Sequence, residues 1–528
     1  MKELRSIAVA FIGVACAAAE PLELQKGDVV AFVGGADLVR MQDDGRLEAA
    51  LTLRFREANP QFRDLAWEGD TVYFQNAVRE RWRTEAFGGW SEQLRRIKAT
   101  VVIFQFGKME SFEGVAKIAQ FKEAYGKLID DLAGEGRQAI LLAPSPFEWP
   151  AARERAALNS YTKAVASLAK SKKIPFITGN QADSVEAFIL GLTGKKEPNG
   201  PTYEQIRSTV REKHRLWVEY WRPTNWKCIF GDDSKRIFSK ASHGRPSIQE
   251  EWATYPALIQ AAENAIQKGA PWNAPAPSAL TGSKEANLKN ELASFEVLEG
   301  FEVNLFADES KGIANPLSVR WDANGCMYVA CSDAYPQIEP GVQGNDKVIT
   351  LRDTDGDGRA DESMVFADGL RIPTGMEVGP DRVYIGQGTE LLTLRDTTGD
   401  GHANERRTLL TGFGNGDSHQ TSNSFVWSPG GELWWCQGDG IESRVETPFG
   451  VSSLFQAGVF RLRPNELRLD GLLDDFMGPG NPWGIAFDDY GQSFVIDGAG
   501  GVSYLTPASI PAKRRLRLPR IGKPGGYC

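Results

Sequence analysis

The sequence predicts an α/β domain with a parallel sheet, followed by an all-β propeller that is incomplete. Three observations carry this prediction. In the first half, short apolar runs alternate with amphipathic helical stretches. In the second half, a template of strand, tight turn and strand recurs, and a Pro- and Ala-rich segment separates the two halves. A chain of 528 residues is long enough to form two hydrophobic cores.

The N-terminal residues 1–19 are predicted to be a signal peptide. Lys2 and Arg5 form a positive region, residues 7–15 form a short apolar stretch, and residues 17–19 offer a small-residue cleavage site. The apolar stretch is too short to span a bilayer. We therefore expect a periplasmic or secreted protein.

Membrane attachment of the mature chain is not expected. Cys16 raises the question of a lipoprotein anchor, but the residues before it lack the leucine that is usual at such sites. No later segment has the pattern of a transmembrane helix. The sequence therefore predicts an exported protein without a transmembrane segment.

Charge and cysteine usage exclude several classes of function. The net charge of −9 argues against nucleic acid as a main partner, because phosphate binding requires clustered Lys and Arg. The chain contains no Cys-x-x-Cys pair, which excludes a zinc ribbon and c-type haem attachment within this chain. Cys326 and Cys331 flank a strand-like run and are expected to be core thiols.

The α/β domain is predicted over residues 22–267. Buried-strand runs are expected at 29–33, 101–104 and 139–143, and helices at 114–132, 203–219 and 248–267. Strands that alternate with helices predict a parallel sheet with both faces covered. Residues 268–292, rich in Pro, Ala and Gly, have the composition of a linker.

The propeller is predicted over residues 293–528. An apolar strand, an Asp/Asn-Gly or Pro-Gly turn and an aromatic-rich strand recur at 317–329, 376–385, 424–435 and 483–496. A period of roughly 50 to 60 residues is that of one four-stranded blade. About four blades fit, and propellers normally close to remove exposed sheet edges. We therefore expect this chain to be truncated at its C-terminus.

Three short blocks in the α/β domain resemble the SGNH-hydrolase superfamily, which has a flavodoxin-like three-layer fold. They are Phe32-Val33-Gly34-Gly35-Ala36, Ala66-Trp67-Glu68-Gly69-Asp70-Thr71 and Phe106-Gly107-Lys108-Met109-Glu110. The resemblance is to the version that precedes propellers in planctomycete and verrucomicrobial exported proteins. It extends over most of this domain.

The departures from this family argue against esterase activity. Acyl transfer needs a nucleophile, a base and oxyanion donors. Ala36 stands where the family has its serine, Met109 stands where it has an asparagine, and residues 183–186 contain no histidine. His214, in a charged helix, is expected to be solvated, and His243 to lie in a loop. The domain is therefore predicted to be catalytically degenerate.

Two Asp-Gly loops in the propeller have the ligand pattern of a calcium site. Ca²⁺ prefers several oxygen ligands on a tightly turned loop. The candidate ligands are Asp353, Asp355, Asp357 and Asp361 in the first loop, and Asp396 and Asp400 in the second. The alternative is a tight hairpin in which Asp and Gly satisfy turn geometry.

Residues 416–450, together with these loops, resemble the "membrane-bound dehydrogenase" propeller of the same exported proteins, which is similar to quinoprotein sugar dehydrogenases. The resemblance implies that His419 takes a sugar hydroxyl proton while hydride passes to pyrroloquinoline quinone (PQQ). It also implies that Arg444 contacts the quinone, and that Asp417 and Gln420 orient His419. Such relatives often carry a c-type cytochrome domain, so a cytochrome is the implied electron acceptor.

Two hypotheses about function follow. The first is an exported, carbohydrate-directed protein like the quinoprotein dehydrogenases, with a sugar or alcohol dehydrogenase activity in the propeller. The alternative is a non-catalytic glycan-binding or scaffold protein, which the missing nucleophile and the open propeller favour.

Overall fold

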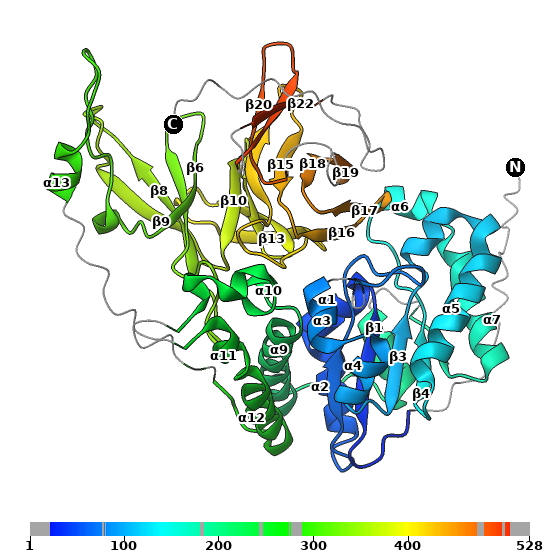
Figure 1. The fold of residues 1–528 in the computed structure, drawn as a ribbon. Helices are drawn as coiled ribbons and strands as arrows, with labels where there is room; N and C mark the ends of the chain where they lie inside the picture. Colours follow the sequence, from blue (N-terminus) through cyan, green and yellow to red (C-terminus); the bar gives the residue numbers. More distant parts are fainter. Residues whose placement is uncertain are drawn as a thin grey trace, which may run out of the picture.

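The computed structural model of the protein describes residues 22–76, 79, 81–179, 184–241, 246–273, 275, 288–472, 480–498 and 502–506. The predicted signal peptide and His243 lie outside the described residues. The chain forms an α/β domain and a β-propeller of four blades, as the sequence predicts (Figure 1). No helix among the described residues combines the length and the apolar character needed to cross a membrane.

The α/β domain is built on a five-stranded parallel sheet with the order β2-β1-β3-β4-β5. Its strands are β1 (Val29–Gly34), β2 (Gln61–Asp64), β3 (Val101–Gln105), β4 (Gln138–Leu142) and β5 (Phe176–Ile177). The three predicted strands are confirmed. The sequence did not indicate β2 and β5, because β2 has one apolar residue, Phe62, among its four residues and β5 has only two residues.

Helices cover both faces of this sheet (Figure 1). The helices of this domain are α1 (Ala36–Asp44), α2 (Arg46–Arg54), α3 (Arg81–Phe87), α4 (Trp90–Arg96), α5 (Ile118–Ala133), α6 (Pro150–Arg155), α7 (Leu158–Lys172), α8 (Ser184–Thr193), α9 (Pro201–Trp221), α10 (Trp226–Ile229), α11 (Ile248–Trp252) and α12 (Tyr255–Lys268). Alternate residues of β1 enter different cores: Val30 and Phe32 pack on one face, Ala31 and Val33 on the other. Burial on both faces explains why this strand is apolar throughout.

The prediction that His214 is solvated is wrong. Its side chain is buried in α9, with Nε2 3.1 Å from Asp43 Oδ1 and 4.0 Å from Asp64 Oδ2. On the same helix, Lys213 is buried against Glu48. The charged residues of α9 therefore turn partly inward, because carboxylates of α1, α2 and β2 are there to pair with them.

The propeller consists of antiparallel sheets arranged as consecutive blades (Figure 1). The first blade contains β6 (Pro316–Trp321), β7 (Met327–Cys331), β8 (Asp346–Arg352) and β9 (Glu362–Leu370), and the second contains β10 (Pro373–Val378), β11 (Val383–Gln387), β12 (Glu390–Arg395) and β13 (Glu405–Thr411). The third blade contains β14 (Asn423–Trp427), β15 (Leu433–Gln437), β18 (Gly458–Arg463) and β19 (Arg468–Leu472). The fourth contains β20 (Pro482–Phe487), β21 (Ser493–Asp497) and β22 (Val502–Thr506). The repeated template forms the first hairpin of each blade. Cys326 and Cys331 are free and buried, as predicted.

An extra hairpin interrupts the third blade. Its strands, β16 (Glu442–Thr447) and β17 (Gly450–Phe455), pair only with each other and lie between β15 and β18 in the chain. Figure 1 shows this hairpin between the propeller and the α/β domain. Phe455 of β17 packs against Phe74 of the α/β domain, with ring centroids 5.6 Å apart. The hairpin is therefore a contact between the domains.

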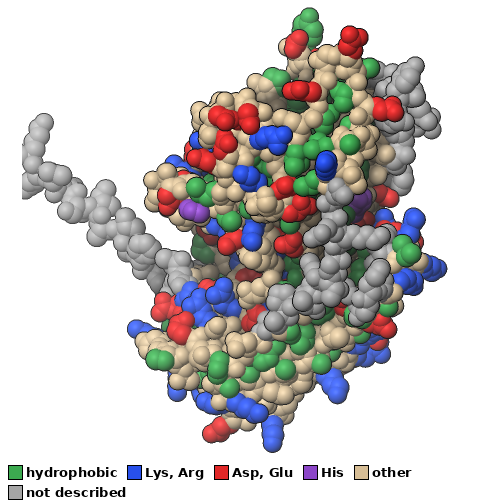
Figure 2. Space-filling model, turned by 90° about the vertical axis from the view of Figure 1, so that its left-hand side faces the viewer, with side chains coloured by type: hydrophobic (Ala, Val, Ile, Leu, Met, Phe, Trp, Pro, Cys, Tyr) green, Lys and Arg blue, Asp and Glu red, His purple; other side chains and the backbone are tan. Residues whose placement is uncertain are grey.

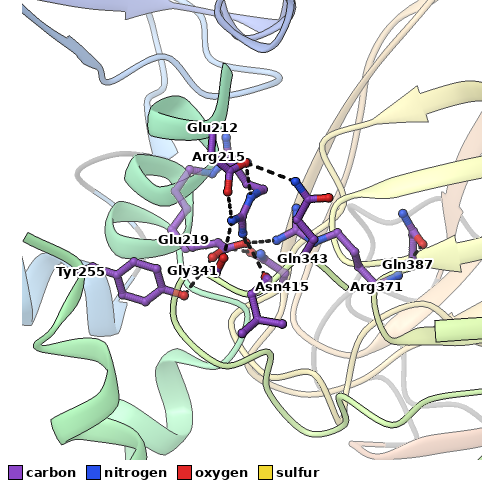
Figure 3. A network of polar contacts seen from close by, with 11 residues as sticks. Glu212, Arg215, Glu219, Tyr255, Gly341, Gln343, Arg371, Gln387 and Asn415 are labelled. Atoms are coloured by element: carbon purple, nitrogen blue, oxygen red, sulfur yellow. Dashed lines mark hydrogen bonds and ion pairs between the residues drawn. The ribbon is translucent and has the colours of Figure 1, made fainter. Parts of the chain in front are cut away.

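A second contact joins α9 to loops of the first blades (Figure 3). The Arg215 guanidinium donates to Glu219 at 2.9 Å and to the backbone oxygens of Gly341 at 2.8 Å and Val342 at 3.1 Å. The buried Glu219 carboxylate also accepts from Tyr255 at 2.9 Å and pairs with Arg371 of the propeller. Charge pairing and backbone contacts thus hold the propeller on this helix.

Replacing Glu219 should loosen this contact. Glu219→Ala removes the shared acceptor of Arg215, Arg371 and Tyr255, and we expect it to lower the free energy of unfolding by at least about 2 kcal/mol. The matched control is Glu204→Ala on the same helix, whose side chain is 60% exposed; it should cost less than about 0.5 kcal/mol. Urea denaturation of both variants measures the difference, and equal losses would contradict the assignment.

Candidate functional site

Three loops meet at the carboxyl ends of the parallel strands, where open α/β sheets usually build their sites. Gly35 and Ala36 follow β1, Gly69 follows β2, and Gly107 follows β3. The fold thus brings the three sequence blocks to one edge of the sheet. The N–H groups of Ala36 and Gly69 converge there on a single oxygen atom.

That oxygen belongs to Glu446, on strand β16 of the propeller. Its Oε1 accepts from Ala36 N at 2.8 Å and from Gly69 N at 3.1 Å. Beside it, Lys108 Nζ donates to Asp37 Oδ1 at 2.7 Å. Burial raises the pKa of Glu446, and the nearby charge of Asp37 adds to this, against the two amides and Lys108.

The space left at this edge is small. The cavity between the loops and Glu446 has a volume of about 20 Å³, which is room for about one water molecule. Of the three described histidines, none contributes to it. Met109 is buried in an apolar cluster with Phe147, against which Val451 of β17 packs. Among the described residues that line this edge there is no serine, threonine, cysteine or histidine, and the two converging amides are already bound to Glu446.

The buried carboxylate of Glu110 links two of these loops, those that follow β2 and β3. Its two carboxylate oxygens each accept a backbone N–H, from Val72 and from Gly107, both at 2.8 Å. Burial raises its pKa to about 7, although these amides lower it. The carboxylate therefore acts as an acceptor that shapes the loops.

The second site surrounds His419, on the propeller. His419 is exposed and precedes β14; its Nδ1 lies 2.5 Å from the Tyr335 hydroxyl. Its ring centroid is 5.0 Å from that of Trp483, in β20, whose side chain is 39% exposed. Burial raises the pKa of Tyr335 to about 12, so this phenol is neutral. Three blades each contribute one of these rings.

Of the two residues predicted to orient His419, Asp417 contacts the backbone of His419 and Gln420 contacts the backbone of Asp417. Asp417 Oδ1 accepts from the His419 N–H at 3.0 Å, while its Oδ2 lies 3.3 Å from Lys227 Nζ. Gln420 is buried, and its N–H donates to the Asp417 carbonyl oxygen at 2.9 Å. Both residues therefore shape the loop that presents the imidazole.

The α/β domain supports this loop directly. Lys227 N, in α10, donates to the Gly416 carbonyl oxygen at 3.0 Å. Asn225 Nδ2 donates to Ser418 Oγ at 2.9 Å, and Ser418 Oγ donates to the Pro336 oxygen at 2.7 Å. The loop before His419 is thus held from both domains.

Arg444 contacts the α/β domain, whereas His419 contacts aromatic side chains of the propeller. Its Nε and Nη2 donate to the Gly69 carbonyl oxygen at 3.0 and 2.7 Å, and its guanidinium stacks on Phe74 at 4.1 Å. All of these contacts are with the α/β domain. The structure therefore places Arg444 near Glu446 on β16, where its Nε and Nη2 already donate to the α/β domain.

The Asp-Gly loops are the outer turns of the first two blades, between β8 and β9 and between β12 and β13. In the first, oxygens of Asp353, Asp355 and Asp361 lie within 4.8 Å of one another. The same carboxylates also accept backbone N–H groups: Asp353 from Gly356 and Gly358, Asp355 from Asp357, Asp357 from Arg359, and Asp361 from Thr354. These are the bonds of a tight hairpin, and calcium binding remains a prediction.

The second loop repeats this bonding. Asp396 accepts from the N–H groups of Gly399 at 2.6 Å and Gly401 at 2.8 Å, and Asp400 accepts from His402 at 3.0 Å. Because the ionised form accepts these bonds, the pKa of Asp396 is lowered to about 2. Asn404 accepts from Thr397 where the first loop uses Asp361.

A larger cavity, of about 590 Å³, lies between α9 and the propeller. Arg215 and Arg371 line it, and both are paired with Glu219. Figure 2 shows Lys and Arg interspersed with Asp and Glu over one face of both domains. The cations of this cavity are therefore largely neutralised by neighbouring carboxylates.

Comparison with known proteins gives one family match. A family model described as a domain of unknown function (DUF7133) matches residues 287–515, which span the propeller. A comparison with curated proteins gives no match.

Among solved structures, part of the chain is similar to the holo form of the PQQ domain of pyranose dehydrogenase from Coprinopsis cinerea, with 16% identity and a TM-score of 0.26. That match covers 35% of this chain and 44% of that domain, so the chain spans less than half of it. The chain is also similar to the acetylxylan esterase Axe2 from Geobacillus stearothermophilus, with 14% identity and a TM-score of 0.22, over 30% of this chain and 78% of that one.

Placing a serine at position 36 should not create an esterase. In Ala36→Ser, the hydroxyl gains no histidine base among the described residues, and Glu446 holds the two amides that would bind an oxyanion. We expect hydrolysis of p-nitrophenyl acetate, followed by absorbance, to match that of the unmodified chain. Saturable hydrolysis that a serine reagent blocks would contradict this expectation.

The hydrogen bonds that Asp396 accepts in the second Asp-Gly loop should persist to a pH well below the ordinary pKa of aspartate. Because the pKa of Asp396 is lowered, its contribution to stability is fully present above the ordinary value of 3.8 and is lost as the pH falls through about 2. We expect the Gly401 amide proton shift in NMR to titrate with a midpoint near 2. Asp396→Asn should abolish this titration, and a midpoint near 3.8 would contradict the prediction.

Proposed function

We propose that this chain is an exported, carbohydrate-directed protein whose propeller binds sugars at the face formed by Tyr335, His419 and Trp483. The observation that carries the proposal is the exposed imidazole of His419, held at Nδ1 by Tyr335 and packed beside Trp483. Export, predicted from residues 1–19, would bring this face to extracellular glycans.

Sugars suit this face because they combine apolar ring faces with hydroxyl groups. Trp483 offers an aromatic surface, and its indole N–H is already used, donating to Asn481 Oδ1 at 2.6 Å. Whichever tautomer His419 adopts, its Nε2 can bind a hydroxyl, as donor or as acceptor. The face thus combines stacking with hydrogen bonding in a fixed geometry.

In this proposal the α/β domain is catalytically degenerate and serves as a platform. It has Ala36 at the nucleophile position, its two converging amides are taken by Glu446, and its helix α10 supports the His419 loop. Its contribution to function is to hold the binding face of the propeller in place.

Oxidation of the bound sugar is the second candidate, favoured by the His419–Tyr335 contact. When Nδ1–H donates to the tyrosine oxygen, Nε2 carries the lone pair needed to accept a hydroxyl proton. The implied oxidant, PQQ, carries carboxylates, so a site that binds it needs cationic side chains to pair with them. Arg444 is bound to Gly69, and Lys227 lies 3.3 Å from Asp417 and 3.5 Å from Asp233.

Neither of these two cations is free to meet the carboxylates of a quinone, and sugar binding is the function that the geometry supports best. A quinone, and a c-type cytochrome that would accept its electrons, belong to the second candidate only.

Sugar binding is tested by titrating the chain with a panel of aldoses and oligosaccharides in a calorimeter. Removing the stacking surface in Trp483→Ala should weaken binding about tenfold or more, and His419→Ala should also weaken it. The matched control is Tyr490→Ala, in the same blade and 95% exposed, which should bind as the unmodified chain does.

Binding that survives both substitutions would place the ligand elsewhere, and absence of binding across the panel would overturn the proposal. Adding PQQ, Ca²⁺ and an artificial electron acceptor separates the second candidate. Reduction of the acceptor that depends on both sugar and His419 would favour a dehydrogenase.

A further inference from the structure

The contact of Glu446 with the α/β domain has the geometry of a ligand in a site. The two amides that hold Oε1 come from separate loops, after β1 and after β2, and meet at the sheet edge. Two N–H groups aimed at one oxygen, in a region of little water, stabilise a negative charge strongly. A turn or a helix cap within one element does not explain such convergence.

Strand β16 is placed to deliver this carboxylate. Side chains alternate along a strand: Val445 is fully buried in the propeller core, while Arg444 and Glu446 on either side of it face the α/β domain. Arg444 donates to the oxygen of Gly69, and Glu446 accepts from its N–H. Both backbone polar groups of Gly69, its N–H and its carbonyl oxygen, are therefore bound by one strand of the propeller.

The site is shaped for these two side chains. A Cβ atom at Gly35 would lie 2.7 Å from Glu446 Oε1, although the backbone there, with φ of −96°, would accept any residue. At Gly69, φ is +72°, and a Cβ atom would lie 2.4 Å from the oxygen of Arg444. Each glycine thus leaves room that a propeller residue fills.

The surroundings of this oxygen are tight and of mixed charge. Lys108 Nζ lies near the carboxylate but is paired with Asp37, whose negative charge acts against that of Glu446. Met109 lines the small cavity beside Glu446 and packs in an apolar cluster with Phe147 and Val451. The two amides are therefore the groups that hold the carboxylate, in a space that admits only a small group on a short aliphatic stem.

We propose that the amides of Ala36 and Gly69 form a carboxylate-binding site, that Glu446 is its built-in ligand, and that this binding docks the propeller onto the α/β domain. The ligand class is a small aliphatic carboxylate, and acetate is the probe that reproduces the end of the glutamate side chain. The proposal is independent of sugar binding at His419.

The first test is a double-mutant cycle between Gly35→Ala and Glu446→Ala. Alone, Gly35→Ala should lower the ratio of folded to unfolded protein about tenfold, because its Cβ collides with Oε1. With Glu446→Ala already present, the same change should cost less than about threefold. Equal effects in both backgrounds would overturn the proposal.

The second test follows amide hydrogen exchange by mass spectrometry in the peptides that contain Ala36 and Gly69. Glu446→Ala should speed exchange at both, since both amides lose their acceptor. Acetate at about 100 mM should restore protection in this variant and change nothing in the unmodified chain, whereas chloride at equal ionic strength should not restore it. Failure of acetate to protect would overturn the carboxylate site.

Two further variants guard against a general loss of folding. Glu446→Gln keeps an oxygen that can accept from both amides, so we expect exchange between that of the unmodified chain and that of Glu446→Ala. Glu362→Ala, at an exposed position of β9, is the matched control and should leave both peptides unchanged. If Glu446→Gln exchanges as fast as Glu446→Ala, or if Glu362→Ala also loses protection, the proposal is overturned.

Discussion

The carboxylate of Glu446, held by two backbone amides of the other domain, is the interaction on which the relation of the two domains depends most directly. A charged group taken out of water is tolerated only when it is paired and hydrogen-bonded. The same requirement governs Arg444 on Gly69 and Arg215 with Glu219. Each of these charges finds its partners across or beside the interface, so correct docking of the domains is what satisfies them.

The two domains have different roles in this arrangement. The strand ends of a parallel sheet are where an α/β domain normally meets its ligand, and here the protein fills that place with its own hairpin. The face around His419 remains exposed, and α10 of the α/β domain supports its loop through Lys227 and Asn225. The α/β domain supports the loop, and the propeller presents the surface at which we propose that a sugar binds.

Much of the fold was predictable from local pattern. β1, β3 and β4 are continuous apolar runs, because both faces of a parallel sheet are covered, and the blade hairpins are marked by their Gly-containing turns. The strand β2 was missed because Phe62 is the one apolar residue among its four, and His214 was misjudged because its helix buries charged residues against carboxylates far away in the chain. His419 stood out by its position, but nothing in the sequence indicated Tyr335 and Trp483 as its neighbours.

The sequence by itself determined the two domain classes, the repeat, the Asp-Gly turns and the presence of alanine at position 36, because these depend on residues close together in the chain or on residue identity alone. Only the tertiary structure decided that Glu446 meets Ala36, from which it is separated by 410 positions, and that Arg444 faces the α/β domain. The physical reason is that convergence of amides and charges from distant loops depends on how the two cores pack, and no local periodicity records that packing.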